Sequence, residues 1–367
     1  MRRTPPPPLT VILDPEDDAA YVRTALAAHD PAVGSVTLHP SPGTAGEIYL
    51  AHDLLAALGK PPLLPGRFTP GTDPSWHAVT AWFCAIPITR LTVLRAHLLT
   101  HQRLERLLDL REATGLHLNL VCHRPRLPAT LQRTLRVSHT ITGGLHAART
   151  NFGPPAEAPP APSHRTANRW ITLPALERFD SLDSSSHCIG TCIPPMIKWR
   201  HRPKPRPRTE ATLREITRRI QIRTAHPRLA ATLAAAVFTA AAAHQLATAR
   251  LEDYDEQAAT LALHDPARTV DDCATHPVPA WAHVFLRAAA CMARLERTQG
   301  RRILAQPDDY QNLMSFAEDT RLRPPQPPSS QRVTTDVDWW WRELQEIEQL
   351  DAMLARDRGR SPRWSPR

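Results

Sequence analysis

The sequence predicts an α/β protein, with a mostly parallel sheet in its first half and an all-α C-terminal domain. Two observations support this fold class. Short apolar runs alternate with segments of helical periodicity through residues 1–150, which is typical of βαβ units and a parallel sheet. Helical periodicity then continues almost without interruption from residue 209 to about residue 301.

Strands are expected where apolar runs lie between turn residues. These runs are Leu9–Leu13, Ser35–His39, Leu91–Leu94 and Leu116–Cys122, with a further candidate at Leu135–Ile141. Helices are expected between them, first after the acidic run Asp14–Asp18 and then over Glu47–Leu58, Ser75–Ala85 and Thr100–Ala113. Parallel strands joined in this way have right-handed connections and bind ligands at their carboxyl ends.

Composition divides the chain into four parts. The α/β domain covers 1–150, and a Pro-rich linker with a pair of cysteines and a basic stretch covers 151–208. A helical domain covers 209–321. The tail, 322–367, holds a helix with three tryptophans and an Arg/Ser/Pro-rich end whose composition is typical of disorder.

The chain is expected to be cytoplasmic and free of membrane spans. The four prolines Pro5–Pro8 are incompatible with the helical core of a signal peptide, and no stretch approaches 18 uncharged apolar residues. Six cysteines in 367 residues are too sparse for a disulfide scaffold. Only three of the 45 basic residues are lysines, a ratio that indicates a bacterium with a GC-rich genome.

The turn Pro40–Glu47 lies between an expected strand and an expected helix, the context in which a P-loop cradles phosphates. Gly43, Thr44 and Gly46 are its candidate nucleotide-binding residues. An active P-loop also needs a Lys that reaches the phosphates and a Ser or Thr that holds Mg²⁺. Gly46 and Glu47 stand in those two positions, so the turn is predicted to be a degenerate P-loop.

Residues 35–140 resemble the AAA+ ATPase subunits that serve bacterial transposition systems. The strand end Leu94-Arg95-Ala96-His97 aligns with their Asp-Glu-Ala-His motif, and Thr114-Gly115 with the strand after it aligns with their sensor segment. Leu and Arg replace the Asp and Glu that would hold Mg²⁺ and activate water. The resemblance therefore implies a P-loop-like, AAA-like fold that has lost ATP hydrolysis, a pseudo-ATPase. The alternative is an ordinary doubly wound domain with an unrelated ligand or none.

A basic stretch in mid-chain is the candidate nucleic-acid interface. Between residues 198 and 223 there are ten Lys or Arg and two Glu. Prolines keep the first half of this stretch extended, so its cations can follow phosphates while a tryptophan stacks on a base. The alternative is a solvated Arg-rich linker. The candidate residues are Lys198, Trp199, Arg200, Arg202, Lys204, Arg206, Arg208, Arg214 and Arg218.

Two further features have two interpretations each. Cys188, Cys192, Cys273 and His276 supply four zinc ligands as two close pairs, or are small residues buried in the core. Trp339, Trp340 and Trp341 lead a helix with one apolar stripe, which binds a protein partner or docks on the chain's own core.

Together these features predict a DNA-binding accessory protein on a degenerate ATPase fold that does not hydrolyse nucleotide. The alternative function is an enzyme that binds a small ligand at the carboxyl edge of the sheet, near Gly43, His97 and His123. No complete catalytic motif is present, so the sequence assigns no catalytic residue. Zinc and an unhydrolysed nucleotide are the two cofactors that it suggests.

Overall fold

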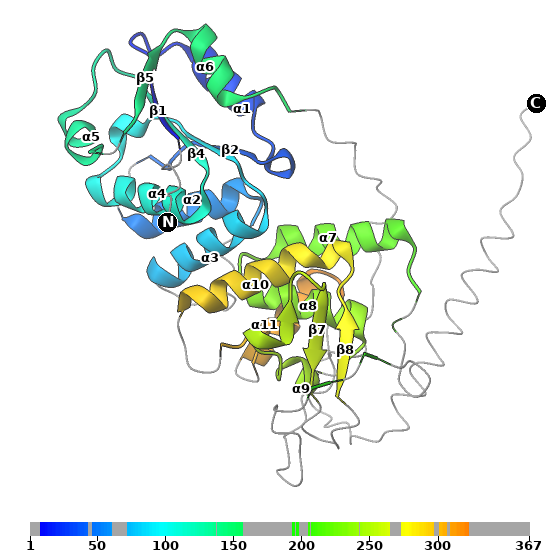
Figure 1. The fold of residues 1–367 in the computed structure, drawn as a ribbon. Coiled ribbons are helices and arrows are strands. Elements are labelled where there is room, and N and C mark those ends of the chain that lie inside the picture. Colours follow the sequence, from blue (N-terminus) through cyan, green and yellow to red (C-terminus); the bar gives the residue numbers. More distant parts are fainter. Residues whose placement is uncertain are drawn as a thin grey trace, which may run out of the picture. The chain divides into compact units, whose positions relative to one another are not determined.

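The computed structural model describes residues 8–42, 46–60, 72–136, 138–156, 193–194, 196–197, 205, 207–241, 243–264, 273–296, 301–306 and 309–322 (Figure 1). The chain divides into two units, Met1–Arg323 and Pro324–Arg367, and every described residue belongs to the first. The three tryptophans of the predicted partner helix therefore lie outside the described residues.

A five-stranded parallel sheet forms the first part of the fold, in the order β2–β3–β4–β1–β5 (Figure 1). Its strands are β1 (Leu9–Leu13), β2 (Ser35–Leu38), β3 (Arg90–Val93), β4 (His117–Cys122) and β5 (Thr140–Gly143). β1 lies inside the sheet, with β4 on one side and β5 on the other, whereas β2 is an edge strand. The predicted mostly parallel sheet is confirmed.

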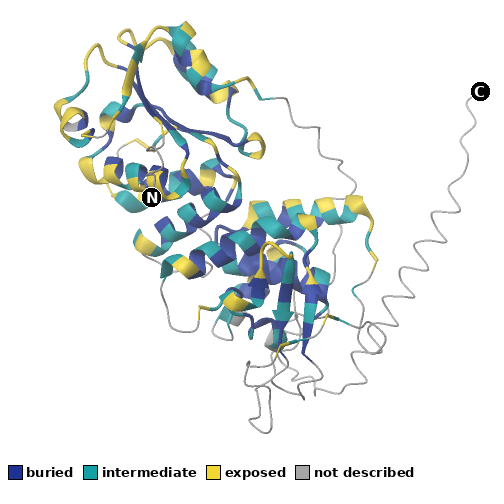
Figure 2. Cartoon of the chain, viewed as in Figure 1, coloured by how far each residue is buried: buried dark blue, intermediate teal, exposed yellow. Residues whose placement is uncertain are grey.

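Helices cover both faces of this sheet. α1 (Ala19–Ala27) and α6 (Leu145–Phe152) pack on one face, and α2 (Glu47–Ala57), α3 (Thr72–Ala85) and α4 (His101–Thr114) pack on the other. Right-handed crossovers explain this division. The connections from β2 to β3 and from β3 to β4 cross the sheet in one direction, whereas the connection from β1 to β2 crosses it in the opposite direction, so their helices lie on opposite faces. Buried residues accordingly follow the strands, and exposed ones lie on the outer sides of the helices (Figure 2).

The strand expected at Leu135–Ile141 is displaced. A short helix, α5 (Ala129–Thr134), precedes it, and β5 begins only at Thr140. The reason is that β5 lies at an edge and is largely exposed, so its residues lack the apolar run from which the inner strands were predicted.

The C-terminal half is mainly helical, as expected, but it is not all-α. Its helices are α7 (Glu210–Arg223), α8 (Pro227–Thr239), α9 (Ala243–Leu246), α10 (His283–Glu296) and α11 (Tyr310–Asp319). A three-stranded antiparallel sheet joins them, with β7 (Thr260–Leu263) between β6 (Tyr254–Asp255) and β8 (Ala274–Pro277). These strands have only two to four residues, so the sequence did not distinguish them from helix.

One hydrophobic core continues from the parallel sheet into the C-terminal helices. The indole of Trp82 in α3 lies edge-on to Phe285 in α10, with 6.4 Å between ring centroids, and donates a 2.7 Å hydrogen bond to the carbonyl of Ala225. The ammonium of Lys60, fully buried, lies 4.0 Å from the Trp82 ring and donates to the carbonyl of Gln221. Side chains from both halves therefore share one interior.

Candidate acid–base site

Charged side chains gather where β1, β3 and β4 end. Asp14 comes directly after β1, Arg95 lies two residues after β3, and His123 comes directly after β4. Because the three strands are parallel, their carboxyl ends meet at one edge of the sheet, where α/β folds bind their ligands.

The centre of the cluster is a pair formed by Asp14 and His123. Nδ1 of His123 lies 2.7 Å from Oδ2 of Asp14, and the two side chains are 0% and 1% exposed. Asp14 is itself fixed, because its amide donates to the carbonyl of Cys122 and its Oδ1 accepts the amide of Asp18 at 3.1 Å. The carboxylate therefore holds the imidazole in one orientation.

The other ring nitrogen of His123 is open. Nε2 is buried and has no hydrogen-bond partner among the described residues. Since a carboxylate only accepts hydrogen bonds, Asp14 fixes the proton of the neutral ring on Nδ1 and leaves the lone pair on Nε2. A bound water, an ion or ligand, or a catalytic role explains a buried polar atom that has no partner in the protein.

A second carboxylate, Asp17, approaches the same imidazole. Its Oδ1 lies 3.1 Å from Nδ1 of His123, and both of its oxygens accept hydrogen bonds from Arg95 at 3.3 Å. Asp17 and Arg95 both have left-handed backbones, with φ of 52° and 51°. Residues other than glycine adopt this conformation at a cost, and such strain is concentrated at functional sites.

His97 lies beside the pair. Its ring centroid is 6.1 Å from that of His123 at an interplanar angle of 72°, and its Nδ1 is a buried atom without a partner in the described part of the chain. Burial lowers the pKa of His97, and the nearby guanidinium charges of Arg124 and Arg95 lower it further. His97 is therefore a neutral imidazole at neutral pH.

The same three residues also have the donor set of a cation site. One atom each from Asp14, Asp17 and His123 lies within 4.8 Å of the others, and carboxylates with an imidazole suit several divalent metals. A metal on Nδ1 would move the ring proton to Nε2, which has no acceptor among the described residues. Histidines that bind metals donate their second N–H to a partner. The geometry therefore fits a base better than a metal ligand.

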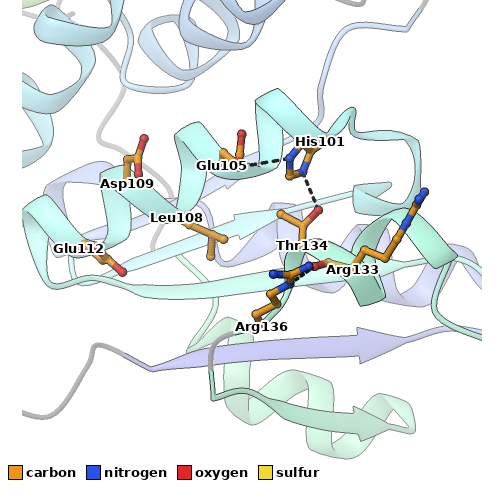
Figure 3. Close-up of a pocket in the computed structure, with 8 residues that line it drawn as sticks. All are labelled: His101, Glu105, Leu108, Asp109, Glu112, Arg133, Thr134 and Arg136. Carbon is orange, nitrogen blue, oxygen red and sulfur yellow. Dashed lines mark hydrogen bonds and ion pairs between the residues drawn. The ribbon is translucent and has the colours of Figure 1, made fainter.

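A groove of about 880 Å³ between α4 and α5 is the second candidate (Figure 3). Acidic side chains from α4 form one wall, Arg133 of α5 and Arg136 just after that helix form the other, and His101 bridges the helices through a 2.8 Å hydrogen bond to Thr134. The pKa of Asp109 is raised, first by burial and then by the nearby glutamates. The groove is broadly open and holds no oriented pair comparable to that of Asp14 and His123.

The predicted nucleotide turn follows β2, an edge strand, rather than the interior strand β1. Gly46 is the N-cap of α2, and its carbonyl accepts two hydrogen bonds from Arg103 at 2.9 and 3.2 Å. Glu47 forms a 2.6 Å ion pair with Arg106. Gly43 and Thr44 lie outside the described residues, so nucleotide binding at this turn stays a prediction.

Most of the predicted nucleic-acid residues also lie outside the described ranges: Lys198, Trp199, Arg200, Arg202, Lys204 and Arg206. Two that are described bind acids of their own helix. Arg214 forms a 3.5 Å pair with Glu210, and Arg218 binds both oxygens of Glu215 at 2.9 Å. Their charges are therefore partly compensated within α7.

Of the four predicted zinc ligands, Cys188 and Cys192 lie outside the described residues. Cys273 and His276 are buried, just before and within β8, and positions three apart on an extended chain project to opposite faces. The chain shortly after Cys192 follows the same strand, because the amide of Ile197 donates to the carbonyl of Thr275 at 2.9 Å. The zinc site stays a prediction.

Sequence reasoning found His97 and His123 but missed Asp14 and Asp17, which it read only as acids before a helix. The N-cap is in fact Asp18, whose side chain accepts the amide of Ala20. The usable signal was positional, because Asp14 and His123 each directly follow a buried strand.

Comparisons with known proteins assign no family. No protein-family model matches the chain, and no curated protein matches it either. Within the described ranges, every helix is too short or too polar to cross a bilayer.

Proposed function

We propose that the chain binds a small molecule at the carboxyl ends of β1, β3 and β4, and that His123 acts there as a general base. One observation carries this proposal: Nδ1 of His123 is fixed by the buried Asp14, while its buried Nε2 faces no partner among the described residues. A positioned imidazole with a free lone pair is the usual general base in enzymes.

The neighbouring residues support this role. Asp14 keeps the ring in the reactive tautomer and stabilises the imidazolium that forms when Nε2 takes a proton. Asp17 adds a second negative charge at 3.1 Å. His97 places a second, neutral imidazole beside His123. The proposed chemistry is proton abstraction from water or from an acidic substrate atom.

The test uses two probe substrates, p-nitrophenyl acetate and p-nitrophenyl phosphate. The wild type is expected to hydrolyse at least one of them faster than buffer, and His123→Gln is expected to lower that rate by about 100-fold, the usual contribution of a general base. His101→Gln, which removes an exposed histidine of α4, is the matched control and keeps the wild-type rate. A His123→Gln protein that matches the wild type, or a wild type inactive on both probes, contradicts the proposal.

A nucleic-acid role is the second candidate, and the sequence between residues 198 and 223 favours it, with ten cations against two glutamates. On this proposal the chain is a non-hydrolysing accessory protein on a degenerate ATPase fold. Replacing six cations of this stretch, Lys198, Arg200, Arg202, Lys204, Arg206 and Arg208, by Gln should flatten the salt dependence of DNA binding, since each lost phosphate contact reduces the slope by about 0.9. An unchanged slope would remove this candidate and leave the acid–base site untouched.

A further inference from the structure

A pair of cysteines lies where the two halves of the fold meet. Cys84 is near the end of α3, and Cys291 is in α10, the helix that packs along α3 (Figure 1). Their thiols are hydrogen-bonded to each other, and both residues are partly exposed. The other two described cysteines, Cys122 and Cys273, are buried.

The surroundings make Cys84 the thiolate of the pair and Cys291 its hydrogen-bond donor. The pKa of Cys84 is lowered to about 7, chiefly by the hydrogen bond from Cys291 and also by Arg287 and Arg294. The same hydrogen bond raises the pKa of Cys291, so the shared proton stays there. Burial instead raises the pKa of Cys122 to about 12, which keeps that thiol unreactive.

We propose that Cys84 and Cys291 are an oxidation site, in which a peroxide joins α3 to α10 through a disulfide. The sulfur of Cys84 attacks one peroxide oxygen, the O–O bond breaks, and the leaving hydroxide takes up a proton as water. This step gives a sulfenic acid on Cys84. The sulfur of Cys291 then attacks that of Cys84, the S–O bond breaks, and the hydroxide leaves as water with the thiol proton of Cys291.

The geometry suits this reaction in three respects. The two thiols are within hydrogen-bonding reach on two helices that pack together, so small side-chain movements bring the sulfurs to bonding distance. Partial exposure admits a molecule as small as hydrogen peroxide. Arg287 and Arg294 lie four residues before and three residues after Cys291, on the same face of α10, where they favour the attacking thiolate. The proposal is independent of the acid–base site.

The test treats the reduced full-length protein with a slight excess of hydrogen peroxide and maps disulfides by mass spectrometry of peptides. The expected product is a Cys84–Cys291 cross-link, with the loss of two titratable thiols and a higher melting temperature that reductant reverses, because the bond closes a long loop. Cys84→Ser abolishes the cross-link. Cys291→Ser stops the reaction at a sulfenic acid on Cys84 that dimedone traps.

Cys273→Ser is the matched control, since it removes a buried cysteine and leaves the cross-link unchanged. Each variant is first compared with the wild type by circular dichroism in reductant, so that a folding defect is recognised. Iodoacetamide at pH 7 gives a second measurement, in which Cys84 reacts at least about tenfold faster than Cys122. Absence of the cross-link in the folded wild type, or pairing of Cys84 with another cysteine, overturns the proposal.

Discussion

His226 should make the stability of the fold sensitive to acid. It is the N-cap of α8 and is only 8% exposed, and its amide donates to the hydroxyl of Thr224. Burial lowers the pKa of His226 to about 4, with a further contribution from Arg228 that outweighs the opposing effect of Asp309. The folded protein therefore keeps this ring neutral at pH values where the unfolded chain protonates it.

The sign and size of the effect follow from these two pKa values. The unfolded chain takes up the proton near the ordinary value of 6.5, and the folded chain takes it up only near 4. Unfolding is therefore favoured progressively as pH falls from about 6.5 to about 4, and the effect levels off below that. A difference of about 2.5 pKa units corresponds to a loss of about 3 kcal/mol of stability.

The assay compares the wild type with His226→Asn by urea unfolding at pH 7.5 and pH 4, followed by tryptophan fluorescence. Asparagine does not titrate and is a favourable N-cap, so the helix start is retained. Other titrating groups act equally on both proteins. The wild type should therefore lose about 3 kcal/mol more than the variant between the two pH values. Equal losses would show that the buried ring does not resist protonation.

Three substitutions test the packing. Gly34→Ala should destabilise the fold by several kcal/mol, because φ is +85° and the new Cβ would lie 2.6 Å from the carbonyl oxygen of Pro87. Gly115→Ala should cost only about 1 kcal/mol, because φ is +75° but no atom lies within 4 Å of the new Cβ. Equal costs by urea denaturation would contradict the described loop. Trp82→Phe should cost about 2–4 kcal/mol by the same assay, since it removes volume and leaves the buried carbonyl of Ala225 without its donor; a cost below about 1 kcal/mol would argue against the shared core.

The inner strands of the sheet were predictable because each is a run of apolar residues between turn signals. β1 and β4 are buried along almost their whole length, and such strands read as continuous apolar segments. β5 and the C-terminal strands were not predictable in this way. β5 is largely exposed and the C-terminal strands have only two to four residues, so pairing with neighbouring strands, rather than local preference, decides their conformation.

The candidate site was predictable only in part. The sequence indicated that ligands bind at the carboxyl edge and named His97 and His123. It could not show that Asp14 meets His123, because the two residues are 109 positions apart and only the pairing of β1 with β4 brings them together. The contact between Cys84 and Cys291 is equally invisible in the sequence, since it depends on how α3 packs against α10.

The proton position on His123 is the most direct test of the proposed acid–base site. Long-range nitrogen–proton NMR of the folded protein at pH 7.5, with the ring signals assigned by comparison with His123→Gln, distinguishes the two neutral tautomers. The expected result is a protonated Nδ1, held by Asp14, and an unprotonated Nε2. A ring protonated on Nε2 alone would contradict it, because that nitrogen would then have no lone pair with which to accept a proton.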